Sequence, residues 1–188
     1  MVLETPTASS PIVIALMGLP GSGKTTVATL LARTCALSVI SRDVIREALF
    51  RPCGFTEVER QTAYRALLIA TGACLTLGRS CVIDGMTFSR AAEVNDMRAV
   101  ARRAGARFLP VLLDCPTAIA QARASAESAD HRRAPANGDA AALIAAVARR
   151  FELPPADTLH LDATKPPEAI ASAIRDRIDA FPDEDIGC

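Results

Sequence analysis

The chain has 188 residues, and its 21 basic side chains are balanced by 21 acidic ones. A chain of this length can bury a substantial core in one domain without metal ions or disulfides. A protein without net charge has no global field that gathers polyanions. A dedicated nucleic-acid scaffold is therefore disfavoured, and nucleic-acid binding would need a local basic groove.

Apolar runs alternate with longer Ala-, Leu- and Arg-rich segments of helical character, which predicts an α/β fold with a parallel sheet covered on both faces. The strands are predicted at residues 12–17, 38–40, 81–84, 108–113 and 158–161. The helices are predicted at residues 24–35, 44–50, 57–77, 90–104, 117–126, 140–151 and 167–178.

Cysteine usage and the chain ends predict a cytoplasmic protein. The six cysteines include no Cys-x-x-Cys pair and mostly lie in apolar stretches, which indicates buried thiols in a reducing compartment. No run of about 18 apolar residues could cross a membrane. Residues 1–10 lack the features of a secretory signal, so we expect a flexible N-terminus, one domain over residues 11–180 and a tail at residues 181–188.

A phosphate loop follows the first predicted strand, because residues 18–25 read Gly-Leu-Pro-Gly-Ser-Gly-Lys-Thr and match G-x-x-x-x-G-K-[ST]. Its glycines let successive N–H groups point at one anion, and the helix that follows adds its positive end. On this solvent-facing loop, Lys24 is expected to reach the β- and γ-phosphates of ATP, and Thr25 to ligate Mg²⁺. The predicted nucleotide-binding residues are Gly18, Pro20, Gly21, Ser22, Gly23, Lys24, Thr25 and Thr26.

Asp43 and Arg46 follow the second predicted strand. Ligands of parallel α/β sheets bind beyond the carboxyl ends of the strands, so Asp43 is expected near the γ-phosphate, where it can take a proton from an acceptor hydroxyl. Arg46 lies one helical turn further on, and its planar fork suits an anionic or polar part of the acceptor. The alternatives are a helix N-cap for Asp43 and a solvated helix charge for Arg46.

The third predicted strand ends in Asp84 after two β-branched residues, the pattern of a Walker B carboxylate that orients Mg²⁺. An aspartate that only starts a turn is the alternative. Asp114 ends the fourth strand in the same way and ranks below Asp84 as a metal ligand.

Three arginines are candidates to stabilise the transferred phosphoryl charge, because arginine suits that role. Arg123 lies on the predicted helix that leads into a polar, turn-rich segment, and Arg132 and Arg133 lie within it. We expect residues 125–139 to form a mobile lid over the nucleotide. An ordinary solvated loop is the alternative.

These motifs together resemble the AAA_33-type P-loop kinases. The resemblance rests on Gly-x-Pro-Gly-Ser-Gly-Lys-Thr-Thr, on Ser-Arg-Asp-x-x-Arg, on Val-Ile-Asp-Gly-Met-Thr-Phe and on Phe-Glu-x-Pro-Pro at residues 151–155, and it covers about residues 11–178. The group is similar to the kinase domain of polynucleotide 5′-hydroxyl kinases, to chloramphenicol phosphotransferase and, more remotely, to zeta toxins and gluconate kinase. It implies a nucleoside-monophosphate-kinase-like three-layer sandwich, with a five-stranded parallel sheet of order 2-3-1-4-5 and an Arg-bearing lid.

The resemblance also implies roles for single residues: Asp43 as the base, Arg46 as the acceptor clamp and Arg123 as the lid arginine. The family usually has a second lid arginine shortly after the first, but in this chain that position falls near Ser125 and Ala126. The second lid arginine is therefore expected at residue 132 or 133. The Asp-x-Thr-Asn pattern of polynucleotide kinases is replaced by Asp-Gly-Met-Thr, so a nucleic-acid acceptor is possible but not favoured.

The sequence thus predicts an ATP- and Mg²⁺-dependent phosphotransferase that moves the γ-phosphoryl group to a hydroxyl of a small-molecule or nucleotide-like acceptor. One alternative is a nucleotide-dependent ATPase switch or partner-binding module. A guanine-nucleotide switch is disfavoured, because residues 164–167 read Thr-Lys-Pro-Pro and have Pro where the guanine-binding motif needs Asp. Another is a toxin-like kinase held by an inhibitory protein. The sequence specifies neither the acceptor nor the oligomeric state.

Overall fold

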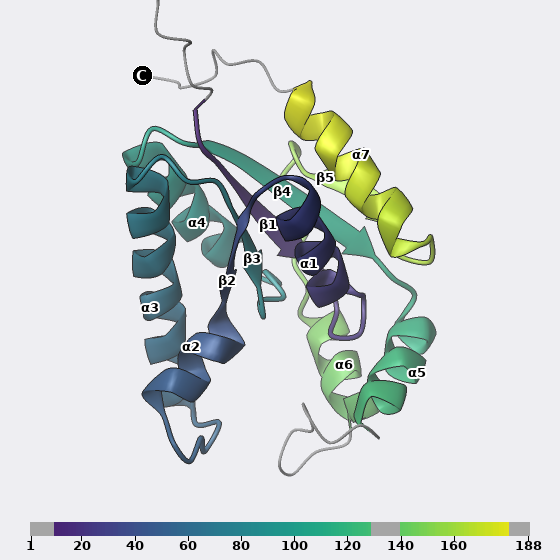
Figure 1. The fold of residues 1–188 in the computed structure, drawn as a ribbon. Coiled ribbons are helices and arrows are strands. Elements are labelled where there is room, and N and C mark those ends of the chain that lie inside the picture. Colours follow the sequence, from purple (N-terminus) through teal and green to yellow (C-terminus); the bar gives the residue numbers. More distant parts are fainter. Residues whose placement is uncertain (1–9, 129–139, 181–188) are drawn as a thin grey trace, which may run out of the picture.

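The computed structural model describes residues 10–128 and 140–180. Within them, a twisted sheet of five parallel strands lies between two layers of helices (Figure 1). The strand order is β2-β3-β1-β4-β5, so the predicted fold class and the order 2-3-1-4-5 are confirmed. The strands are β1 (Ile12–Met17), β2 (Ser38–Ser41), β3 (Cys81–Asp84), β4 (Arg107–Asp114) and β5 (Leu159–Asp162).

Helices cover both faces of the sheet, with α1 and α7 on one face and α3 and α4 on the other (Figure 1). No helix among the described residues is both long and apolar enough to cross a membrane. The helices are α1 (Lys24–Thr34), α2 (Arg42–Leu49), α3 (Glu57–Thr76), α4 (Ala91–Arg103), α5 (Thr117–Ser128), α6 (Ala140–Arg149) and α7 (Pro167–Asp179).

The central strand β1 is buried along its whole length, which explains its uninterrupted apolar sequence. Side chains alternate between the two faces of a strand, so Ile14 and Leu16 enter the core under α1 and α7. Ala15 and Met17 enter the other core, under α3 and α4. The two hydrophobic cores therefore hold the carboxyl end of β1 from both faces of the sheet, and the phosphate loop begins at that end.

Helix α2 begins at Arg42, two residues before the predicted start. Ser41 ends β2 and takes the N-cap position with an extended backbone, so the interpretation of Asp43 as an N-cap is wrong. Asp43 lies instead in the first turn of α2, where the helix dipole favours a carboxylate. The other helix and strand bounds agree with the sequence prediction to within two residues.

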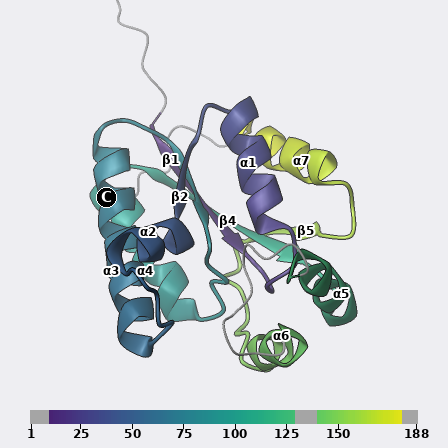
Figure 2. The same cartoon turned by 60° about the horizontal axis from the view of Figure 1, so that its bottom comes forward.

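The strands of a parallel sheet all end at one edge, and Figure 2 turns this edge toward the viewer. Ser41 of β2 pairs with Asp84 of β3, so the start of α2 lies beside the end of β3. Beyond β4, helices α5 and α6 lie side by side at the same edge (Figures 1 and 2). The predicted lid at residues 125–139 falls mostly outside the described residues.

The core under α3 gives a direct test of this packing. Leu67 of α3 is fully buried, whereas Ile69 on the same helix is 73% exposed. Leu67→Ala is expected to lower the free energy of unfolding by about 2–5 kcal/mol, because it leaves a cavity in a close-packed core. Ile69→Ala, the matched control, should change it by less than about 0.5 kcal/mol. Urea unfolding of both variants checks this, and equal small losses would contradict the packing described here.

Candidate active site

The phosphate loop connects β1 to α1, and three of its glycines adopt positive φ angles: 138° at Gly18, 80° at Gly21 and 91° at Gly23. A Cβ on Gly18 would lie 2.7 Å from the carbonyl oxygen of Leu113 in β4. A Cβ on Gly21 would collide with the backbone of Ala120 in α5. These glycines thus allow the tight turn of the loop and let β4 and α5 approach the loop backbone closely.

The ammonium group of Lys24 lies inside the loop. Its Nζ donates hydrogen bonds to the carbonyl oxygens of Gly18 (2.9 Å) and Leu19 (2.7 Å) and to the hydroxyl of Ser22 (3.3 Å). Lys24 is only 9% exposed, so the expectation of a solvent-facing lysine is wrong. Burial lowers the pKa of Lys24 to about 8, and the carboxylates of Asp84 and Asp43 partly oppose this shift.

The two residues predicted to hold Mg²⁺ lie together. The Thr25 hydroxyl donates a hydrogen bond of 2.9 Å to Oδ1 of Asp84, which is itself buried at the end of β3. A hydroxyl and a carboxylate oxygen fit Mg²⁺, which usually takes few protein ligands and completes its shell with water and phosphate oxygens. Among the described residues, no cluster of three or more His, Cys, Asp or Glu side chains is arranged to hold a metal ion.

Asp43, in the first turn of α2, lies beside Gly85, the residue that follows Asp84. Its Oδ1 lies 2.9 Å from Nη2 of Arg46, one helical turn further along. Its Oδ2 lies so close to Gly85 that a Cβ there would be 3.1 Å away, and Gly85 has a φ of 73°. The Asp43 side chain remains 41% exposed, so its carboxylate can still be approached by a ligand.

Arg46 is held by two contacts and is not a solvated helix charge. Its side chain is 11% exposed, and its guanidinium lies over the ring of Phe55, 4.6 Å from the centroid. The sequence predicts the acceptor pocket from residues 46–71 and 85–90, but no motif there singles out Phe55 or Gly85 as a neighbour of Asp43 and Arg46. The signal for Gly85 was its place directly after Asp84, where only glycine tolerates both the positive φ and the neighbouring carboxylate.

The remaining predicted site residues lie elsewhere. Arg123 of α5 donates a hydrogen bond of 2.9 Å from Nη1 to the carbonyl oxygen of Ala163, just after β5. This contact places it on the β5 side of the phosphate loop, while Asp43 approaches from the β2 side. Thr26 is exposed in the first turn of α1. Arg132 and Arg133 lie outside the described residues.

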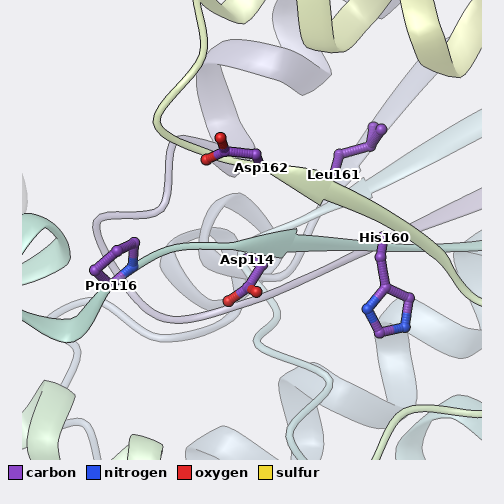
Figure 3. A pocket seen from close by; sticks show the side chains of 5 residues that line it. All are labelled: Asp114, Pro116, His160, Leu161 and Asp162. Carbon is purple, nitrogen blue, oxygen red and sulfur yellow. The ribbon is translucent and has the colours of Figure 1, made fainter.

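Asp114 ends β4 and lines an open hollow of about 300 Å³ at the ends of β4 and β5. The hollow is also lined by Pro116, His160, Leu161 and Asp162, and Figure 3 shows the Asp114 carboxylate and the His160 ring on the same side of the sheet. Asp162 accepts hydrogen bonds from the backbone and the hydroxyl of Thr164, and these bonds lower its pKa.

Solved structures share this fold over nearly their whole length. A Chloroflexus aurantiacus protein, described only provisionally as a kinase, matches with a TM-score of 0.73 and 21% identity over 89% of this chain and 98% of its own. The APS kinase of Mycobacterium tuberculosis, solved with AMPPNP and APS, matches with a TM-score of 0.65 and 22% identity over 90% and 98%. A gluconokinase from Sinorhizobium meliloti matches with a TM-score of 0.61 and 19% identity over 91% and 97%.

Sequence comparison gives the family. No curated protein matches the chain. The model of the AAA_33 family, described as an AAA domain, matches residues 13–154, from the second residue of β1 to beyond α6. That span contains the phosphate loop and the carboxylates of Asp43 and Asp84. The chain therefore belongs to the AAA_33 family and has the fold of P-loop kinases.

Proposed function

We propose that the chain is an ATP- and Mg²⁺-dependent phosphotransferase that moves the γ-phosphoryl group to a hydroxyl of a small-molecule or nucleotide-like acceptor. The observation that carries the proposal is the position of Asp43. Its carboxylate is accessible, is paired with Arg46, lies beside Gly85 and is close enough to Lys24 to oppose the lowering of that lysine's pKa. The kinase names of the gluconokinase and APS kinase structures support the same reaction class.

The donor side of the site is the phosphate loop. The Lys24 ammonium would exchange its bonds to the loop's own oxygens for bonds to the β- and γ-phosphates, and the loop N–H groups would bind the same phosphates. Thr25 and Asp84 would hold Mg²⁺, which neutralises charge on the phosphates when bound. Arg123 would exchange its bond to Ala163 for one to a phosphate and add positive charge from the β5 side.

The acceptor side is Asp43 and its supports. As the acceptor oxygen attacks the γ-phosphorus and the bond to the ADP oxygen breaks, the hydroxyl proton passes to the Asp43 carboxylate. Arg46 holds Oδ1 and so directs the carboxylate. We propose that residues 11–180 act as this catalytic unit. The described cysteines are free thiols, which supports the cytoplasmic location proposed from the sequence.

Loss of the Lys24 charge tests the donor side. Lys24→Met keeps an apolar stem of similar length and is expected to lower ATP turnover by about 10²-fold or more, because a preorganised phosphate contact is lost. The control is Lys165→Met. Lys165 is the other lysine of the chain and is exposed, so its loss should leave turnover unchanged. The rate of ADP release is measured for both variants and for the wild type, and a thermal melt of each protein checks that it is folded. Turnover that survives in folded Lys24→Met protein contradicts the proposal.

Asp43→Asn tests the acceptor side, since asparagine keeps the size and an oxygen for Arg46 but cannot take the proton. We expect kcat for acceptor phosphorylation to fall by about 10²-fold or more while AMPPNP affinity stays the same. Glu47→Gln, an exposed carboxylate on the same helix, is the matched control. A screen of hydroxyl compounds for acceptor-dependent ADP release supplies the substrate. Loss of AMPPNP binding would instead assign Asp43 to the nucleotide site.

A further inference from the structure

The connection between β3 and α4, residues 85–90, contacts both sides of the candidate active site. At its start, a Cβ on Gly85 would lie 3.1 Å from both the backbone nitrogen and Oδ2 of Asp43. Two residues later, the carbonyl oxygen of Thr87 accepts a hydrogen bond of 3.1 Å from the N–H of Gly18, the first residue of the phosphate loop. The shape of this connection therefore affects how Asp43 lies relative to the phosphate loop.

The backbone of this connection is strained at Phe88. Its φ angle is 46°, in the left-handed region that bulky residues rarely adopt, and its side chain is buried in the core under α3 and α4. A residue other than glycine costs free energy in this conformation and keeps it only where surrounding contacts impose it. Burial fixes the ring, and contacts to the neighbouring backbone are needed to fix the rest.

Glu152, which lies shortly after α6, supplies two of these contacts. Its backbone N–H donates a hydrogen bond of 2.9 Å to the carbonyl oxygen of Ser89, the residue after Phe88. Its Oε2 accepts a hydrogen bond of 2.7 Å from the N–H of Ala91, the first residue of α4. That N–H has no acceptor within its own helix, and the positive end of the helix favours a carboxylate. Glu152 thus holds the backbone on the C-terminal side of Phe88.

The position of Glu152 is fixed independently of this connection. Its neighbour Phe151 packs against the core under α3 and α4. Further along, the two Nη atoms of Arg98 in α4 donate hydrogen bonds of 2.7 and 3.0 Å to the carboxylate of Asp157. The chain is therefore attached to α4 and its core on both sides of Glu152, which makes Glu152 a rigid support.

We propose that Glu152 is a positioning residue for phosphoryl transfer, which keeps residues 85–90 in the shape that places Asp43 against the phosphate loop. The inference rests on the proposed phosphotransferase function and adds a residue that acts on the reaction only through backbone contacts. Without the Glu152 carboxylate, the strain at Phe88 would relax and the residues before it would move. Transfer needs close alignment of the reacting groups, so this displacement should slow it. Nucleotide binding should persist, because the hydrogen bonds of Lys24 fix the phosphate loop separately.

The kinetics of three variants test the proposal. Glu152→Ala removes the carboxylate and is expected to lower kcat for acceptor phosphorylation by about tenfold or more, with AMPPNP affinity within about twofold of wild type. Glu152→Gln keeps an oxygen for the N–H of Ala91 and should retain kcat to within about threefold. Glu93→Ala is the matched control, because Glu93 accepts a hydrogen bond of 3.3 Å from the N–H of Arg90 at the same helix end but lies within α4 itself. It should leave kcat unchanged.

Hydrogen exchange of the free protein gives a readout that loss of a helix cap alone would not move. The N–H of Gly18 is bonded to Thr87 and not to Glu152, so its exchange rate reports whether the connection has moved. We expect this rate, measured by NMR, to rise about tenfold or more in Glu152→Ala and to stay the same in Glu93→Ala. If Glu152→Ala does not fold, Glu152→Asp keeps the charge but is one methylene too short, and it should show the same changes in kcat and exchange.

The outcomes separate this inference from the proposed function. Wild-type kcat, or a wild-type exchange rate at Gly18, in folded Glu152→Ala overturns the positioning role and leaves the phosphotransferase proposal intact. A large loss of AMPPNP affinity in that variant would assign Glu152 to the nucleotide site and would also overturn the positioning role. Wild-type protein that binds AMPPNP but phosphorylates no acceptor contradicts the proposed function, and exchange at Gly18 then decides alone whether Glu152 holds residues 85–90.

Discussion

The phosphate loop is held in shape by the buried ammonium group of Lys24. An ammonium has three N–H donors, and all three are satisfied here by Gly18, Leu19 and Ser22. Burial without those acceptors would be prohibitive, and even with them it lowers the pKa of Lys24 to about 8. The loop is thus closed around a positive charge before any phosphate arrives, and phosphate oxygens would compete with the loop's own acceptors for it.

The surrounding carboxylates can approach this charge because parallel strands end at one edge. Asp84 is brought beside Thr25 by β3, which lies next to β1, and the pairing of Ser41 with Asp84 brings the start of α2 alongside. Gly85 leaves room for Asp43 at that junction. The pairing of β2, β3 and β1 therefore brings the phosphate-binding groups and Asp43 together. Helices α1, α3, α4 and α7 pack on the two faces of the sheet.

Much of this arrangement could be predicted from the sequence. Apolar runs separated by helical segments specify a parallel sheet, and the phosphate loop and the strand-terminal Asp84 are local patterns whose meeting follows from the strand order. The partner of Arg123 could not be predicted, because Ala163 lies forty residues away and meets it only through packing. Neither could the burial of Lys24 and of the Nε atom of Arg42, since the sequence shows a charge but not what surrounds it.

The fate of the γ-phosphorus tests the central claim most directly. Phosphorus NMR of a reaction that holds ATP, Mg²⁺ and a panel of hydroxyl compounds follows that atom to its product. The account predicts a new phosphomonoester signal that grows as the γ-signal of ATP declines and is absent with Asp43→Asn. Inorganic phosphate as the only product would contradict transfer to an acceptor and would mark the chain as a hydrolase.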